Sequence, residues 1–178
     1  TYSAVYVSSV LVAPTSSGEY TIQGTVNGPT AFEGQTAVKS TITTRGTQYG
    51  VTLDATVLSY QVAADNDLVR TIGTEASITF QGFPATTKMV FAAPASLNNE
   101  FTLAVGSSLT KTETATSTTV IPSLPIPVPP STNTSSSTHT FEARETVTVL
   151  GRSYDTCRYK MVTPESAGAT TSWYIFGK

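Results

Sequence analysis

Hydrophobic and polar residues alternate with a period of two along most of the chain. In segment 19–27, Tyr20, Ile22 and Val26 fall on one face and polar side chains lie between them. Successive side chains of a strand point to opposite sides, so this period predicts β-strands with one buried face. The same alternation occurs in segments 35–44, 75–81 and 99–105, whose apolar positions are Val38 and Ile42; Ala76, Ile78 and Phe80; and Phe101, Leu103 and Val105.

Turn sequences separate these segments and set the fold class. The tetrapeptides NGPT and QGFP and the segments RGTQYG, ADND and AAPAS combine Gly, Pro, Asn and Asp, the residues that favour turns. Many short strands at regular spacing are typical of an antiparallel sandwich or a curved, half-barrel sheet. The sequence therefore predicts an all-β protein, and its 178 residues suit a single domain spanning 1–178.

A proline-rich segment, 120–138, interrupts the alternation. Its five prolines cannot donate to a ladder and favour polyproline II. We expect a long crossover packed on its own domain, followed by a mobile Ser/Thr tip. The alternative is an arm that docks on a partner. The residues that would make either contact alternate with the prolines: Ile121, Leu124, Ile126 and Val128. Asn133 also begins a glycosylation sequon, which matters only in a source that glycosylates exported proteins.

The N-terminal segment, 1–14, is apolar on both faces of a predicted strand, and a strand of that kind is covered on both sides. It is either an interior strand of its own fold or a donor strand that completes the sheet of a neighbouring subunit. In the second interpretation the assembly residues are Val5, Val7, Val10, Leu11 and Val12.

The segment Glu145–Val162 contains the single cysteine and has the pattern of a hairpin. A three-residue loop at 151–153 would pair Val147 with Cys157 and Ala143 with Met161. That register gathers the apolar residues on one side, namely Ala143, Val147, Val149, Cys157, Tyr159 and Met161. The thiol is then predicted to be a buried structural group that behaves as a small hydrophobe, and no His lies near it in sequence to lower its pKa.

The same hairpin, with the sequence TTSWYIFGK that follows, resembles the C-terminal pattern of uncharacterised exported bacterial proteins and lipoproteins. In that pattern an E-x-V-T-V strand, a Gly turn and an aromatic-Asp-Thr-Cys strand precede a T-T-x-W-Y strand. The resemblance covers Glu145–Lys178. It implies a cell-envelope or secreted location and an antiparallel, half-barrel sheet, and it implies no activity. Proteins with this pattern continue beyond the point where this chain stops, so a trimmed C-terminus is expected.

The amino-acid composition argues against nucleic acid and a membrane-spanning helix. Only 12% of the residues are charged, about half of the usual ~25%, and the net charge of −2 gives no basic surface for nucleic acid. No apolar run reaches the ~18 residues of a membrane-spanning helix. High Thr and Ser content with little Lys favours the outside of a cell. A chain that starts at Thr1 suggests a processed N-terminus, and a single Cys leaves the compartment open.

The chain lacks a catalytic, metal-binding or cofactor-binding signature. His139 is the single histidine, so any Ser-His-Asp arrangement would depend on it. The S-x-x-K match at 108–111 lies in an extended Thr-rich run. The acidic segment 65–67 lacks the Gly and Glu of a calcium loop. The aromatic segment 173–176 is expected to be core at a terminal strand rather than a surface on which a sugar stacks. We therefore expect a protein that is not an enzyme and holds no cofactor or metal.

Three functions remain. The leading hypothesis is a non-enzymatic structural or interaction protein of the cell exterior, a surface or filament-type subunit assembled by β-strand addition, whose partner is itself or another surface protein. The alternative is an envelope half-barrel that binds an apolar ligand or lipid, with the proline-rich segment as a lid. The third is a hydrolase that uses His139.

Overall fold

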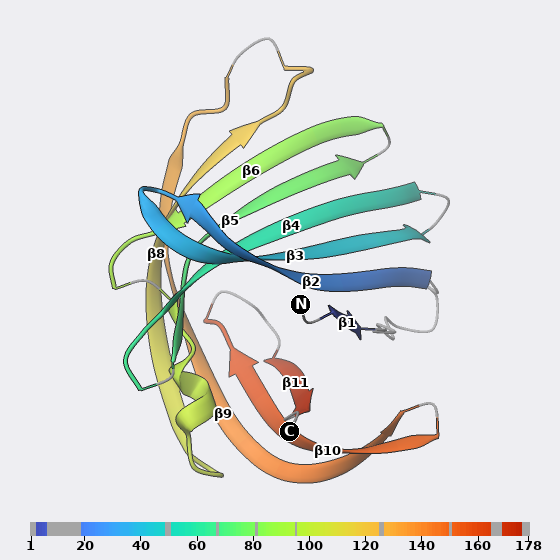
Figure 1. Cartoon of the computed structure of the whole chain (residues 1–178), viewed down its shortest axis with the longest axis vertical. Coiled ribbons are helices and arrows are strands. Elements are labelled where there is room, and N and C mark those ends of the chain that lie inside the picture. The colour runs from blue at the N-terminus through green and yellow to red at the C-terminus, as the bar shows by residue number, and fades with distance from the viewer. Residues whose placement is uncertain are drawn as a thin grey trace. The chain divides into compact units, whose positions relative to one another are not determined.

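The computed structural model describes residues 3–6, 19–48, 51–66, 68–80, 82–94, 96–124, 127–149, 151–164 and 169–175. The described residues form antiparallel strands and one short 3-10 helix, which confirms the all-β prediction (Figure 1). None of them belongs to a helix with the length and apolarity needed to cross a membrane. The strands are β1 (Ser3–Tyr6), β2 (Glu19–Phe32), β3 (Gln35–Gln48), β4 (Val51–Ala63), β5 (Val69–Phe80), β6 (Phe83–Phe91), β7 (Ser96–Leu97), β8 (Ser108–Val120), β9 (Ser131–Val149), β10 (Arg152–Val162) and β11 (Ala169–Ile175), and the helix is η1 (Asn99–Thr102).

The strands pair in the order β1-β2-β3-β4-β5-β6-β8-β9-β10-β11, and β7 pairs with β5. Tight turns produce most of these neighbour pairings. Phe32 pairs with Gln35 across Glu33 and Gly34, which both have positive φ, 47° and 74°. This is the two-residue type I′ turn whose twist matches that of the strands.

The chain packs as two compact units. Unit 1 comprises Thr1–Leu97 and Ala115–Asn133, and unit 2 comprises Asn98–Thr114 and Thr134–Lys178.

An aromatic stack forms the core of unit 1. The rings of Phe32 and Tyr60 lie 4.0 Å apart and nearly parallel, beside buried Ala37 and Ile72. The Tyr60 hydroxyl donates to Glu75 Oε2 at 2.7 Å. Burial and this carboxylate raise the pKa of Tyr60 to about 12, because both favour the neutral phenol.

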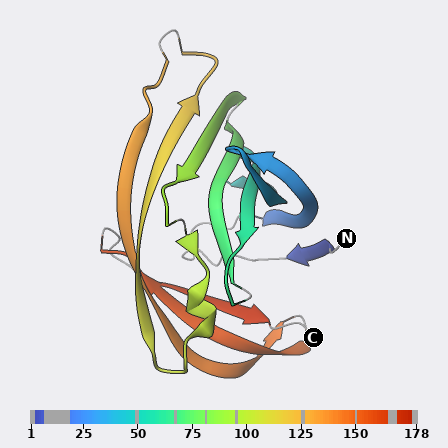
Figure 2. The ribbon, with the colours of Figure 1, turned by 60° about the vertical axis from the view of Figure 1, so that its left-hand side comes forward.

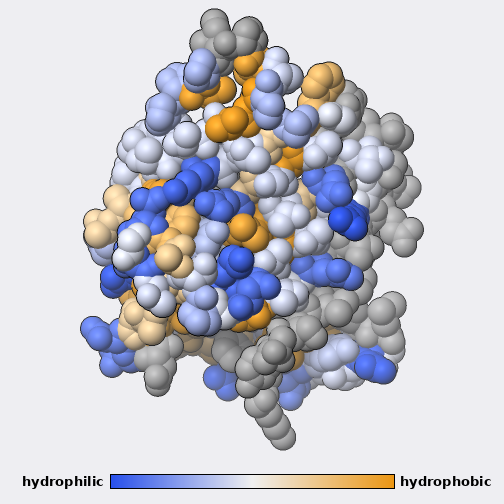
Figure 3. Space-filling model, turned by 45° about the horizontal axis from the view of Figure 1, so that its top comes forward, coloured by the Kyte–Doolittle hydropathy of each residue, from blue (hydrophilic) through white to orange (hydrophobic). Residues whose placement is uncertain are grey.

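Several large aliphatic side chains of unit 1 remain exposed. The predicted alternation in β3 is present, but Val38 and Ile42 lie on its more exposed side. Val26 of β2 and Ile78 of β5 are exposed as well. On the face seen in Figure 3, hydrophobic residues form small separate groups among residues of intermediate and low hydropathy.

A second aromatic cluster forms the core of unit 2. Phe141, Cys157 and Tyr159 are buried, and Phe101 and Leu103 pack against them. The Phe141 and Tyr159 rings stack at 4.7 Å. This confirms the prediction of a buried thiol, since Cys157 is 5% exposed.

The predicted register of the β9–β10 hairpin is wrong. Val149 pairs with Arg152, so the loop is the two residues 150–151, and Cys157 pairs with Arg144 instead of Val147. Gly151 supplies the positive φ, 75°, that such a turn needs. As a consequence, Ala143, Val147 and Val149 pair with residues on the side opposite Cys157, namely Arg158, Tyr154 and Arg152.

A β-bulge explains how the apolar cluster still forms. The register shifts between Arg158 and Tyr159, where Glu142 is the extra residue of β9. One inserted residue reverses the side to which later side chains point. Phe141 therefore lies opposite Tyr159, on the side of Cys157.

The proline-rich segment is shorter than predicted and connects neighbouring strands. Val120 ends β8, and residues 131–138, expected to be a mobile tip, belong to the long strand β9. Because β8 and β9 are adjacent, as both ribbon views show (Figures 1 and 2), residues 121–130 close a hairpin and do not cross over the sheet. Of the predicted contact residues, Leu124 is exposed, Ile121 and Val128 are partly buried, and Ile126 lies outside the described residues.

The first strand pairs within its own chain. Ser3–Tyr6 form the edge strand β1, which is antiparallel to β2. Val5 therefore belongs to a strand of the protein's own sheet, but that strand lies at the edge and not in the interior as one interpretation expected. Val7, Val10, Leu11 and Val12 lie outside the described residues.

Candidate functional site

Unit 2 contains a pocket of about 580 Å³. Its apolar lining consists of Phe101, Leu103, Phe141, Cys157 and Tyr159. Its polar lining consists of Arg144, Glu145, Thr146, Asp155 and Thr156. One pocket thus has an aromatic part and a charged part, the combination that binds an amphipathic molecule.

Strand alternation and the bulge bring the pocket residues together. Cys157 and Tyr159 are two residues apart on β10 and point to the same side, and their partners on β9 are Arg144 and Phe141. Asp155 continues this row and pairs with Thr146.

The segment after η1 supplies the remaining apolar lining. It is held to β9 by two backbone hydrogen bonds: Gly106 N–H donates to Phe141 O at 2.7 Å, and Phe141 N–H donates to Ser107 O at 3.0 Å. Gly106 has a φ of 82°, which suits glycine in a tight turn. The predicted strand at 99–105 is wrong, because 99–102 is η1 and the residues up to Ser107 form no strand. Phe101 can therefore place its ring edge against Tyr159 and Tyr174.

Some polar groups that line the pocket are already hydrogen-bonded to one another. Thr146 Oγ1 donates to Asp155 Oδ1 at 3.2 Å, and Thr156 Oγ1 donates to the Glu145 carbonyl at 2.9 Å. Arg144 makes no ion pair with any residue that the structure describes. Its guanidinium is therefore the group with the most hydrogen-bonding capacity left for a ligand.

The phenol of Tyr159 stays protonated at neutral pH. Burial raises the pKa of Tyr159, and Cys157 and Glu100 add to the effect, whereas Arg144 opposes it. The aromatic part of the pocket is thus uncharged, and an apolar ligand body can contact it without desolvating a phenolate.

His139 borders a second cavity of unit 2, of about 100 Å³, together with Glu100, Tyr159, Met161, Ser172 and Tyr174. Burial and nearby Lys111 lower the pKa of His139, so its imidazole is neutral at pH 7. His139 Nε2 lies 2.9 Å from Ser137 Oγ. Within the described part of the chain no carboxylate hydrogen-bonds to this imidazole, and Glu100 is ion-paired with Lys111. A serine-histidine pair is present, but the third group that orients such a histidine is missing from these contacts.

Metal ligands do not gather in the described residues, where no group of three His, Cys, Asp or Glu side chains is close enough to hold an ion. Beside the acidic segment 65–67, Ala64 N–H donates to Leu68 O at 2.9 Å and Leu68 N–H donates to Asp65 O at 3.4 Å. Asp67 itself lies outside the described residues.

The aromatic segment near the end of the chain is not core, contrary to the prediction. Trp173 is 49% exposed, Tyr174 43% and Ile175 58%. They belong to β11, which is the last strand of the sheet, so fewer neighbours cover them. Among the described residues of this segment, only Tyr174 makes ring contacts, with Phe101 and Tyr159, and Phe176 lies outside the described residues.

Of the residues predicted for assembly or for the docking arm, those that the structure describes line neither cavity. The sequence signals for the pocket were weak, because Phe141 and Arg144 face one side only after the register shift. Cys157 and Tyr159 were the exception, since simple alternation placed them together. Comparisons of the chain with protein-family models, curated proteins and solved structures find no match.

Proposed function

We propose that this protein is a non-enzymatic binding protein and that unit 2 binds one amphipathic molecule. The observation that supports the proposal is the pocket of about 580 Å³ between the aromatic cluster and the charged residues of β9 and β10. Pockets of roughly 300–1,000 Å³ that are apolar with a few polar groups are typical of small-molecule sites.

The lining indicates the chemistry of the ligand. An apolar or aromatic body fits against Phe101, Phe141 and Tyr159, and a polar head fits against Arg144 and Asp155. A carboxylate or sulfonate can accept hydrogen bonds from the guanidinium of Arg144, which no described residue ion-pairs, while a hydroxyl can donate to Asp155. Lipids with an anionic head and aromatic acids both belong to this class.

The proposal includes an extracellular or cell-envelope location. The low charged fraction of 12% and the many Thr and Ser residues support this location, as does the resemblance of the C-terminal segment to exported proteins.

Anilinonaphthalene sulfonate, which has an aromatic body and an anionic head, is a suitable probe for the pocket. Leu103→Trp adds bulk to the lining, whereas Leu124→Trp places the same residue in the exposed β8–β9 loop. We expect saturable binding of about one probe per chain by calorimetry, weakened about tenfold or more by Leu103→Trp and unchanged by Leu124→Trp. Absence of saturable binding, or equal effects of the two variants, would exclude the pocket as the site.

Assembly by strand addition is the second candidate, and the sheet edges favour it. β1 pairs with only four residues of the 14-residue strand β2, and within the described residues β11 pairs with β10 alone. Exposed edges of this kind are templates for an added strand. The donor would be the N-terminal segment of another copy, with Val5, Val7, Val10, Leu11 and Val12 as contacts.

Deletion of residues 1–14 tests this candidate. Native mass spectra of protein from its own source should show multiples of the chain mass, and the deletion should leave only the monomer. A deleted chain that still forms multiples rules out N-terminal donation. A monomer that carries a small extra mass, lost on denaturation, favours the binding protein instead.

A further inference from the structure

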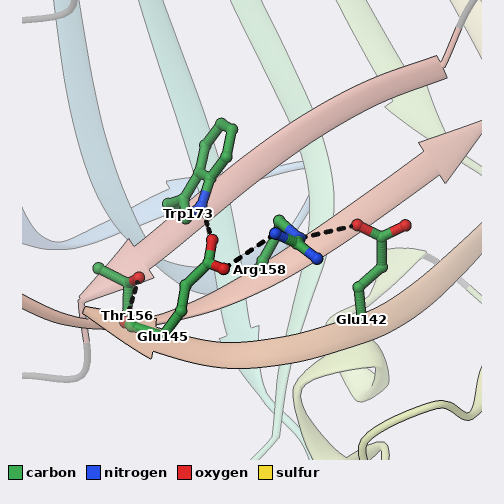
Figure 4. A network of polar contacts seen from close by, with 5 residues as sticks. All are labelled: Glu142, Glu145, Thr156, Arg158 and Trp173. Atoms are coloured by element: carbon green, nitrogen blue, oxygen red, sulfur yellow. Dashed lines mark hydrogen bonds and ion pairs between the residues drawn. The ribbon is translucent and has the colours of Figure 1, made fainter. Parts of the chain in front are cut away.

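A polar network lies on the side of β9, β10 and β11 that is opposite Cys157 (Figure 4). Trp173 Nε1 donates to Glu145 Oε1 at 2.6 Å. Arg158 Nη1 donates to Glu145 Oε2, and Arg158 Nε donates to Glu142 Oε2, each at 2.9 Å. We call these four residues, Glu142, Glu145, Arg158 and Trp173, the Trp173 cluster.

The register of the three strands produces this arrangement. Arg158 pairs with Trp173 on one side and with Ala143 on the other, and paired residues of antiparallel strands share a face. Glu145 lies on that face one pair further along, opposite Thr156. The bulge adds Glu142 next to Ala143, and this extra residue supplies the second carboxylate.

The indole of Trp173 is both held and exposed. Its N–H is used in the bond to Glu145, so the orientation of the ring is fixed before any ligand arrives. About half of the residue, 49%, is nevertheless exposed. A rigid aromatic surface of this kind binds a partner at a low cost in conformational entropy.

The cluster keeps unused hydrogen-bonding groups beside that ring. Arg158 has five N–H donors, of which the network uses two, and its Nη2 makes no hydrogen bond to a residue that the structure describes. Glu142 Oε1 accepts no hydrogen bond from a described residue. A donor and an acceptor thus lie side by side, the arrangement that two neighbouring hydroxyls of one ligand can satisfy.

The local charge favours an uncharged ligand. The carboxylates of Glu142 and Glu145 are balanced by Arg158 and by Lys160, which follows two residues later on the same side of β10. A cation attracted to the indole face would gain no net Coulomb attraction here, and neither would an anion. Hydrogen bonding and ring contact remain as the recognising interactions.

We propose that the Trp173 cluster is a carbohydrate-binding site that takes a neutral pyranose residue of a glycan. The C–H groups on one face of a pyranose are weakly positive and pack against the negative face of an aromatic ring. Its vicinal hydroxyls can accept from Arg158 and donate to Glu142. Trp173 lies on the last strand in the pairing order and is about half exposed, which suits contact with one residue of a longer glycan.

This site differs from the pocket of the proposed function. Trp173, Arg158 and Glu142 do not line the pocket, and only Glu145 borders both. Loss of one binding activity by substitution at residues other than Glu145 therefore leaves the other intact, and the two proposals can fail separately.

Trp173 is the only tryptophan of the chain, so its emission reports on this site alone. The full chain is titrated with neutral hexasaccharides of glucose, mannose, galactose, xylose and N-acetylglucosamine, and is also run in gels that contain the corresponding soluble polysaccharides. We expect a saturable change in Trp173 emission and retarded migration with at least one of these glycans.

Variants separate a binding role from a structural one. Trp173→Ala should abolish the retardation, Trp173→Phe should retain part of it, and Glu142→Gln should weaken binding about tenfold. Ile175→Ala, at an exposed neighbour on the same side of β11, should bind as the unaltered chain does. Far-UV circular dichroism checks that each variant is folded.

Two results would overturn the proposal. One is the absence of any response to the whole glycan panel by the unaltered chain. The other is glycan binding that persists in a folded Trp173→Ala or Trp173→Phe variant with unchanged affinity. A response of Trp173 to tetramethylammonium without a response to sugars also contradicts it, because it identifies a cation site.

Discussion

Gly73 in β5 lies beneath the ring of Phe32 in the core of unit 1. A Cβ atom at this position would be 2.6 Å from the Met89 carbonyl oxygen and closer still to two ring carbons of Phe32. Both neighbours are fixed, one as sheet backbone and the other in the stack on Tyr60. The absence of a side chain at Gly73 is therefore a packing requirement of this core.

Gly73→Ala is expected to lower the free energy of unfolding by about 1–3 kcal/mol or more, the usual cost of an overpacked core. Ser77→Ala, at an exposed position of the same strand, should change it by less than ~0.5 kcal/mol. Urea denaturation followed by circular dichroism measures both. Equal stability of the two variants would contradict the packing around Phe32.

The imidazole of His139 should make the stability of the folded protein depend on pH. Burial and Lys111 lower its pKa, while Glu100 and Glu113 act in the opposite direction. An unfolded histidine titrates near 6.5. The folded state therefore binds the proton less tightly than the unfolded state, so His139 contributes stability above pH ~6.5 that is lost as the pH falls through the folded pKa.

The chain has one histidine, so a single imidazole signal in the proton NMR spectrum reports this pKa. We expect its midpoint below 6.5, and we expect His139→Asn to reduce the fall in urea stability between pH 7 and pH 5. A midpoint at or above 6.5 in the folded protein would show that the imidazole is not desolvated.

At the scale of elements, β8 and β9 are joined by a ladder of hydroxyl pairs on one exposed face. The five consecutive pairs have oxygen–oxygen distances between 2.7 and 3.0 Å. They are Ser108–Thr140, Thr110–Thr138, Thr112–Ser136, Thr114–Thr134 and Thr116–Thr132. Each pair is a cross-strand contact of the kind that stabilises a sheet by ~0.2–1 kcal/mol. The ladder therefore helps to hold the Ser/Thr-rich start of the 19-residue strand β9 against β8.

A double-mutant cycle on Thr112→Val and Ser136→Ala tests the ladder. The two changes should couple by about 0.2–1 kcal/mol, because each removes the same hydrogen bond. The control cycle pairs Thr112→Val with Thr140→Ala, two pairs further along the ladder, and should show almost no coupling. Coupling of equal size in both cycles would mean that the strands respond as a whole and not through individual pairs.

At the scale of the whole molecule, few charged side chains are available to keep copies of the protein apart in solution. The chain has 12 acidic and 10 basic residues, and its isoelectric point is near 5.3. Near that pH the mutual repulsion of molecules disappears, while aliphatic side chains such as Ile42 and Ile78 stay exposed. Hydroxyl groups hydrate the surface but provide no repulsion.

We expect turbidity of a concentrated solution to be greatest close to pH 5 and to fall on either side. Substituting Asp at Thr52 and Ser77, two exposed positions of unit 1, should move the maximum to lower pH. Turbidity that is flat between pH 4 and pH 8, or that is unmoved by the added carboxylates, would show that hydration alone keeps the protein in solution.

Local sequence determined the strands of this protein and several of its turns. Alternation at 19–27 and 35–44, and Gly at positions 34 and 151, act through near neighbours, because strand period and turn conformation depend on backbone geometry alone. The burial of Cys157 was also predictable, since alternation placed it beside Tyr159. Two of the five apolar residues that line the pocket, Cys157 and Tyr159, were predictable in this way.

Tertiary structure decided the register, and with it both candidate sites. The bulge at Glu142 puts Phe141 opposite Tyr159 and adds a carboxylate beside Arg158, and no local pattern marks the extra residue. The pairing of β8 with residues 131–138, and the exposure of Trp173 at the last strand, depend on which strands become neighbours. Strand pairing and register depend on contacts between residues that are far apart in the sequence, and the local sequence pattern does not give the energies of those contacts.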